Sequence, residues 1–166
     1  MLPDLLKPNL KIVFCGTAAG TVSARRQEYY AGPGNKFYPI LFKIGLTDRH
    51  LEPSEYHLLL NYDIGLTDIV KNQSGNDDVL KKESFDVKSF IDKMVNYKPD
   101  IVAFNGKKSA SYVLGYNGRT AKVDYGDQNA TIGSTKLFTL PSTSGAASGF
   151  WDEKYWFELA KKIKII

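Results

Sequence analysis

The chain has 166 residues but only one cysteine, Cys15, and two histidines. A single cysteine excludes an internal disulfide, and the N-terminus lacks the charged, apolar and small-residue pattern of a secretion signal, so we expect a cytoplasmic protein. No apolar run approaches the roughly 20 residues that cross a bilayer, which predicts no membrane partner. His50 and His57 have no nearby cysteine or closely spaced second histidine, so a metal site is not expected.

Two common phosphate-binding motifs are also missing. The chain has no Gly-Lys-Ser/Thr of the P-loop type, and Gly16 and Gly20 are not spaced as in a dinucleotide-binding fold. Internal repeats and long linkers are absent as well. Because 43% of the residues are hydrophobic, the chain can bury a full core, and we expect residues 1–166 to form a single domain.

The charge balance is basic, with 22 Lys and Arg against 18 Asp and Glu, a net charge of +4. A basic surface permits a polyanionic partner such as nucleic acid. Lysine-rich faces are often only solvated surface, however, so charge alone does not identify the partner.

Short apolar runs alternate with segments of helical periodicity along the chain. Continuous apolar runs bounded by glycine or proline are typical of buried parallel strands, and apolar residues spaced by three and four indicate helices. The predicted fold is α/β, a three-layer αβα sandwich with a mainly parallel central sheet. We expect strands at 10–15 and 101–104, an apolar stretch at 66–70, a hairpin at 131–140, helices at 37–44, 53–62, 85–97, 107–114 and 151–163, and loops at 71–82, 115–128 and 141–149.

Residues 16–20, Gly-Thr-Ala-Ala-Gly, form a small-residue turn directly after the first predicted strand. Its backbone N–H groups suit a carbonyl or a developing anion, although such a turn can also serve packing alone. Open α/β sheets bind ligands at the carboxyl ends of their strands, so we expect this turn, the loop around Asp68 and the loop after Leu140 to converge. Tyr29 or Tyr30 offers a flat ring suited to a nucleobase, unless both only anchor the loop.

Six short segments carry a family pattern: CGTAAG at 15–20, AGPGNKFY at 31–38, GLTD at 45–48, GLTDIV at 65–70, AFNGK at 103–107 and LPSTSG at 140–145. In this order they resemble the mismatch-specific uracil-DNA and thymine-DNA glycosylases of the uracil-DNA glycosylase superfamily. The resemblance covers about residues 9–160. It implies an enzyme that flips a mispaired or damaged base out of duplex DNA and hydrolyses its N-glycosidic bond without a metal or cofactor.

The resemblance also implies a base pocket around the first turn. Tyr30 matches a residue whose ring stacks on the flipped base, and backbone groups near Thr17 and Tyr30 match groups that meet the pyrimidine edge. Asn35 matches an asparagine at the start of the following helix, where we expect it to act as a cap. The predicted substrate-binding residues are Gly16, Thr17, Ala18, Ser23, Tyr30 and Asn35.

One position departs from the family in a way that affects catalysis. The usual first motif is Gly-Ile-Asn-Pro-Gly, whose asparagine positions the attacking water, and Ala18 stands at that position here. We predict that Asp68 is the catalytic residue instead, because a carboxylate there can orient or deprotonate water and offset charge on an oxocarbenium-like sugar. The alternative is that Asp68 caps a turn or pairs with a lysine. Weaker candidates are Asp63, Asp77, Asp78, Asp124 and Asp127.

The expected DNA contacts lie in two later segments. Lys107 and Lys108 begin a predicted helix and can meet a phosphate. In the loop after Leu140, small residues replace the family's bulkier wedge, so holding the duplex open requires Phe150 or a loop rearrangement. Arg25 and Arg26 either clamp the strand or are solvated. The predicted DNA-binding residues are Lys107, Lys108, Ser142, Thr143, Ser144, Gly145 and Ala146.

We therefore predict a monomeric DNA-repair glycosylase that acts on double-stranded DNA with G·U or G·T mismatches and leaves an abasic site. It is expected to be monofunctional, since no lysine is placed for a Schiff-base lyase step. Two alternatives remain open: a damaged-DNA-binding protein that has lost catalysis, and a nucleotide or nucleoside hydrolase on the same sheet.

Overall fold

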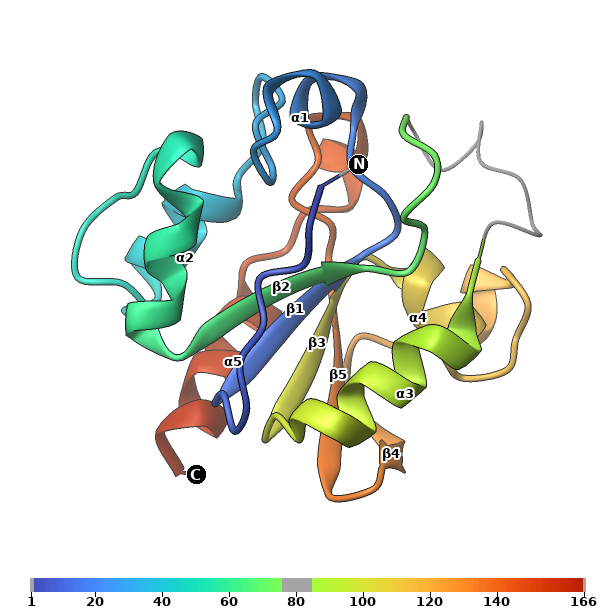
Figure 1. Ribbon diagram of the computed structural model, residues 1–166. Coiled ribbons are helices and arrows are strands. Elements are labelled where there is room, and N and C mark those ends of the chain that lie inside the picture. Colours follow the sequence, from blue (N-terminus) through green and yellow to red (C-terminus); the bar gives the residue numbers. More distant parts are fainter. Residues whose placement is uncertain (1, 76–84, 166) are drawn as a thin grey trace.

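The computed structural model describes residues 2–75 and 85–165, and a five-stranded sheet lies at its centre (Figure 1). The strand order is β2-β1-β3-β5-β4, and every pair is parallel except β4 with β5. The predicted α/β fold with a mainly parallel sheet is confirmed. The strands are β1 (Ile12–Gly16), β2 (Ile64–Asp68), β3 (Ile101–Asn105), β4 (Gly126–Ile132) and β5 (Thr135–Leu140).

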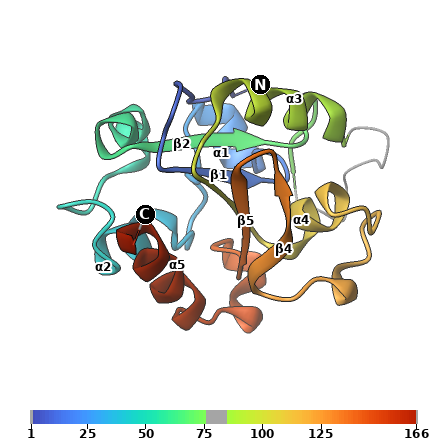
Figure 2. The ribbon, with the colours of Figure 1, turned by 90° about the horizontal axis from the view of Figure 1, so that it is seen from below.

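Helices cover both faces of this sheet (Figures 1 and 2). On one face lie α2 (Phe37–Lys43) and α5 (Lys154–Ile165), and on the other lie α3 (Val87–Tyr97) and α4 (Lys107–Val113). All residues of β1, β2 and β3 are buried. Strands covered on both faces need apolar side chains in both directions, which explains the continuous apolar runs of the sequence.

The two faces of β1 enter separate cores. Phe14 packs with Phe37 of α2 and Trp156 of α5, and the ring centroids of Phe14 and Trp156 are 5.6 Å apart. Cys15 points to the opposite side and belongs to the core that contains Phe90 of α3. Because successive side chains of a strand alternate between faces, one short run supplies apolar groups to both layers.

Two helical segments differ from the sequence prediction. The polar stretch after the first turn forms a short helix, α1 (Thr21–Arg26), which the sequence does not predict because Ser23 is its only buried residue and no apolar stripe marks it. The predicted helix at 53–62 is a 3₁₀ helix, η1 (Pro53–Tyr62). At its start, Glu52 N donates to the Glu55 side chain (3.0 Å).

Strand boundaries also shift. β2 begins at Ile64, before the predicted apolar stretch at 66–70, and ends at Asp68. β4 begins at Gly126, inside a predicted loop, because most side chains of this edge strand face solvent and no apolar pattern marks its start. The other predicted helices are confirmed with small shifts at their ends, and the predicted hairpin at 131–140 is confirmed with a first strand that begins earlier.

The predicted loops contain two 3₁₀ turns, η4 (Thr120–Lys122) and η5 (Gly145–Phe150). Residues 71–75 contain no helix or strand. The rest of the predicted loop at 71–82, including Asp77 and Asp78, lies outside the described residues. Within the described ranges, no helix is long and apolar enough to cross a bilayer.

Candidate active site

A cleft of about 1040 Å³ opens at the carboxyl ends of the parallel strands. Gly16, Asp68 and Asn105 end β1, β2 and β3, and all three line it together with the loop that follows β5. The three loops predicted to converge therefore do so, at the edge where open α/β sheets bind ligands. All residues predicted for catalysis, base binding or DNA binding line the cleft: Gly16, Thr17, Ala18, Ser23, Tyr30, Asn35, Asp68, Lys107, Lys108, Ser142, Thr143, Ser144, Gly145 and Ala146.

Asp68 lies beside Gly16, and both residues line the cleft. The two residues are partners in the parallel register of β1 and β2, and a Cβ atom on Gly16 would lie 2.6 Å from Asp68 Oδ1. The same atom would lie 3.3 Å from the hydroxyl oxygen of Tyr30. Glycine is required here because the carboxylate and the phenol both approach the backbone closely.

Burial sets the acidity of this carboxyl group. Asp68 is 5% exposed, and desolvation raises its pKa to about 6. The positive charges of Lys71 and Lys93 act against this rise, and the negative charge of Asp4 adds to it. Among residues 2–75 and 85–165, no ion pair involves Asp68. Above pH 6 the group is an ionised, unpaired carboxylate that can accept a proton.

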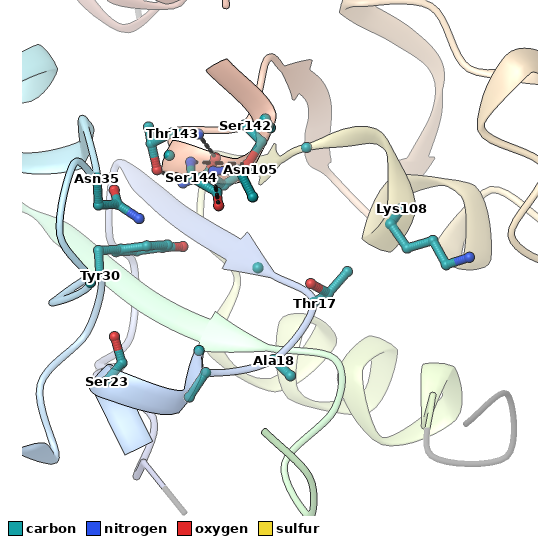
Figure 3. A pocket seen from close by; sticks show the side chains of 18 of the residues that line it. Thr17, Ala18, Ser23, Tyr30, Asn35, Asn105, Lys108, Ser142, Thr143 and Ser144 are labelled. Atoms are coloured by element: carbon teal, nitrogen blue, oxygen red, sulfur yellow. Dashed lines mark hydrogen bonds between the residues drawn. The ribbon is translucent and has the colours of Figure 1, made fainter. Parts of the chain in front are cut away.

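Tyr30 extends into the cleft below Asn35 (Figure 3). Its φ of 55° lies in the left-handed region, so the surrounding loop must hold this conformation. The ring packs on Phe37 with centroids 4.1 Å apart. The hydroxyl oxygen is buried and makes no geometrically complete hydrogen bond among the described residues. Burial raises the pKa of Tyr30 well above its usual value, and the nearby Asn105 side chain acts against this rise. The phenol of Tyr30 is therefore neutral at physiological pH.

Two polar side chains hold the loop that carries Tyr30. Ser23 accepts a hydrogen bond from Ala31 N through Oγ (2.9 Å), which ties the loop to α1. Asn35 accepts from Phe37 N through Oδ1 (3.0 Å) at the start of α2. Asn35 thus caps locally, as predicted, although the residue before the helix is Lys36, whose side chain makes no cap bond. Both contacts shape the wall of the cleft.

The first turn is tied to the segment that follows Asp68. Ile69 N donates to Gly16 O (3.1 Å), and Val70 N donates to Thr17 O (2.7 Å). Gly75 N donates to Ala19 O (3.0 Å), farther along the same turn. These bonds fix the position of the turn relative to the Asp68 carboxyl group. Ala18 lines the cleft with a methyl group that cannot hold water by hydrogen bonding.

The loop after β5 is held by a paired hydrogen bond to the end of β3. Asn105 Nδ2 donates to Thr143 Oγ1, and Thr143 N donates to Asn105 Oδ1, both at 2.9 Å (Figure 3). Thr143 is buried, with 1% exposed. Ser144 accepts from Ala146 N (3.3 Å) and so starts η5. The side chain of Thr143 therefore positions the loop, and its more exposed neighbours Ser142, Ser144, Gly145 and Ala146 line the cleft.

Cationic and aromatic side chains line the rim. Lys107 Nζ lies 4.3 Å from the centroid of the Tyr125 ring, and the side chain of Lys108 points away from the middle of the cleft (Figure 3). Phe150 at the end of η5 is 75% exposed. Arg25 and Arg26 are exposed on α1 and do not belong to the lining.

Sequence reasoning did not assign a site role to Asn105, Tyr125 or the N-terminal residue Leu2, although each lines the cleft. Asn105 could have been found from its place at the carboxyl end of a predicted strand. Leu2 carried no signal because its position depends on how the N-terminal segment packs. Among the described residues, no group of three His, Cys, Asp or Glu could hold a metal ion.

Comparison with known proteins places this arrangement in context. The family model described as "Uracil DNA glycosylase superfamily" matches residues 3–160. The fold is similar to the solution NMR structure of a protein from Methanosarcina acetivorans that is named a "putative Uracil DNA glycosylase". The two share 24% sequence identity with a TM-score of 0.67, and the match covers 98% of this chain and 96% of the other.

Proposed function

Because the chain belongs to the uracil DNA glycosylase superfamily, whose members are DNA glycosylases, we propose that it removes uracil paired with guanine from double-stranded DNA. We assign it to the mismatch-specific uracil-DNA and thymine-DNA type on the six sequence segments that resemble that type. Residues 1–166 would act as one monomeric glycosylase domain.

The Asp68 carboxyl group is the observation that carries this proposal. It is buried beside Gly16 and Tyr30, and its pKa of about 6 leaves it ionised at neutral pH. A general base works best when its pKa lies near the operating pH. Asp68 would thus take over the role of the family's water-positioning asparagine, whose position Ala18 occupies in this chain.

The reaction uses groups that already meet at the floor of the cleft. Asp68 would take a proton from water as the water oxygen bonds to C1′ of the deoxyribose. The bond between C1′ and the base nitrogen breaks, and its electron pair leaves with the base, which is then protonated. Backbone N–H groups of the first turn would donate hydrogen bonds to the departing base, and the ring of Tyr30 would stack on it. The products are a free base and an abasic site.

Substrate choice would depend mainly on the cost of extruding the base. Flipping costs a few kcal/mol and is least costly for a weak pair such as G·U or G·T. Ala18 contributes only a methyl group to the lining of the cleft, which would leave room for a pyrimidine with or without a methyl group. We therefore expect uracil opposite guanine to be released fastest, with thymine opposite guanine as a slower substrate.

Single-turnover release of uracil from a G·U duplex tests the proposal, with alkali revealing abasic sites. We expect the rate to rise with pH through about 6, because Asp68 must lose its proton. Asp68→Asn should lower the rate at pH 8 by about a hundredfold or more, the size of a lost general base.

Asp92→Asn is the matched control, since its carboxylate is exposed on α3 and pairs with Lys88. It should release uracil at the wild-type rate. Equal rates for wild type and Asp68→Asn would exclude Asp68 as the base. If wild type and Asp68→Asn both bind G·U duplex tightly but release no base, the chain is instead a damaged-DNA-binding protein. Ala18 at the position of the catalytic asparagine favours this alternative.

A further inference from the structure

The N-terminal segment adds a contact to the outer edge of β2, next to the cleft. Leu5 and Leu66 form two backbone hydrogen bonds, each 2.9 Å long, in an antiparallel bridge. This bridge brings Asp4 beside Thr67, whose hydroxyl donates to Asp4 Oδ1 (2.7 Å). Thr67 directly precedes Asp68, so the contact is made to the strand that carries the proposed base.

The Asp4 carboxylate also binds two lysines from different parts of the chain. Lys71 Nζ lies 2.9 Å from Oδ1, and Lys93 Nζ of α3 lies 2.7 Å from Oδ2. The Asp4 side chain is 18% exposed. Charge-assisted hydrogen bonds from three partners to a mostly buried carboxylate form a more durable contact than an ion pair on the surface.

Lys71 connects this cluster to the wall of the cleft. Its ammonium group donates to Tyr29 Oη (3.3 Å), and that hydroxyl donates to Pro3 O (2.9 Å). Asp68 and Lys71 also line a second cavity of about 140 Å³, which adjoins the N-terminal segment at Leu2. The Asp4 contacts therefore hold the chain immediately before and shortly after Asp68.

Among the described residues, the charged groups that shift the pKa of Asp68 all belong to this cluster. Lys71, Lys93 and Asp4 carry formal charges that change its acidity. In the part of the chain that the structure describes, the other titratable groups that interact with Asp68 are the hydroxyls of Tyr29 and Tyr30 and the thiol of Cys15, which lies on the opposite face of β1. Burial raises the pKa of each of these three groups, so they stay neutral.

We propose that Asp4 is a positioning residue for Asp68, which holds Lys71 and Lys93 in ion pairs and so keeps Lys71 from pairing with Asp68. This inference rests on the proposed role of Asp68 as the catalytic base. A lysine paired with Asp68 would occupy a carboxylate oxygen and weaken the base. By binding Lys71, Asp4 leaves Asp68 free to accept a proton from water.

The test measures the Asp68 pKa directly, by ¹³C NMR titration of the aspartate carboxyl groups in the full chain, with the Asp68 signal assigned by its loss in Asp68→Asn. Asp4→Asn should lower that pKa by about one unit or more, because both lysines lose their counter-charge. Lys71→Gln and Lys93→Gln should raise it. The acidic limb of the pH profile for uracil release should move in the same two opposite directions.

Asp92→Asn, which removes a carboxylate from the exposed side of α3, should leave the titration of Asp68 unchanged. A merely structural role for the cluster would lower the rate in all three variants without opposite shifts in the titration, and that result would overturn the inference. So would unchanged titration in Asp4→Asn and both lysine variants. If Asp4→Asn does not fold, Lys93→Gln decides the question through the sign of its shift.

Failure of the proposed function would look different. The wild type would then release no uracil, or Asp68→Asn would release it at the same rate, whereas the NMR titration would still report whether Asp4 controls the charge at Asp68. If the pKa of Asp68 shifts in opposite directions in Asp4→Asn and the lysine variants but no base is released, Asp4 controls the charge at Asp68 without a role in catalysis.

Discussion

Gly16 lies where a side chain would collide with the carboxylate of Asp68. A Cβ atom there would come within 2.6 Å of Asp68 Oδ1, whereas one on Gly20 of the same turn would meet nothing within 4 Å. Gly16→Ala should therefore displace the carboxylate and lower single-turnover uracil release by at least about tenfold, since small misplacements of a catalytic group are costly. Gly20→Ala is the control and should keep the wild-type rate. Similar rates for the two variants would contradict this placement of Asp68.

Asp68 should also make stability depend on pH. Its pKa is about 6 in the folded protein against an ordinary value of 3.8, so between these values the folded state holds a proton that the unfolded state releases. The free energy of unfolding should therefore fall as pH rises from about 4 to 6, and the full cost of about 2 to 3 kcal/mol should persist above pH 6.

Asp68→Asn removes this cost because an amide carries no charge. We expect the variant to be more stable than the wild type by about 2 kcal/mol at pH 8 and similar to it at pH 4, measured by urea unfolding. Asp92→Asn should show no such dependence, because its carboxylate is exposed. A difference in stability between Asp68→Asn and wild type that stays constant with pH would show that burial does not raise the pKa of Asp68 as inferred.

At the scale of elements, η5 presents the most exposed large apolar side chain of the cleft. Phe150 is 75% exposed at its end, so its ring contributes little to the core. We expect Phe150 to fill the gap left by a flipped base. Phe150→Ala should then lower uracil release from a G·U duplex by about tenfold or more and leave release from single-stranded DNA nearly unchanged, because an unpaired base needs no extrusion.

Phe42→Ala is a suitable comparison, since Phe42 of α2 is 48% exposed and does not line the cleft. Its rates should match the wild type on both substrates. An equal loss on duplex and single strand in Phe150→Ala would instead assign the ring to the base pocket. If Phe150→Ala releases uracil at the wild-type rate from both substrates, a rearrangement of η5 remains as the way to hold the duplex open.

At the scale of the whole molecule, the net charge of +4 should make DNA binding depend on salt. The contribution of one lysine can be isolated by comparing two substitutions that change the net charge equally. Lys108→Gln should reduce the slope of log affinity against log salt by about one, because Lys108 lies at the cleft and is expected to meet a phosphate. Lys43→Gln removes a lysine of α2 that pairs with Glu153 and should leave the slope unchanged. Equal slopes for the two variants would indicate that net charge, not position, governs binding.

The sequence by itself determined the fold class and the edge of the sheet where the candidate site lies. Buried parallel strands require continuous apolar runs, and the small-residue turn at 16–20 follows the first of them, so local patterns carry this information. Elements with a weak hydrophobic pattern could not be predicted from the sequence. α1 has one buried residue and β4 faces solvent with most of its side chains, so neither carries the periodicity that a prediction needs.

Only the tertiary structure decided which groups meet at Asp68. The direction of its side chain depends on the register of β2 against β1, and a shift by one residue would turn the carboxylate to the other face. The pairing of Asp4 with Lys93 and of Asn105 with Thr143 joins residues far apart in the chain. Such contacts and the burial that raises the Asp68 pKa exist only after the sheet has assembled, because they depend on distances in space and not on spacing in sequence.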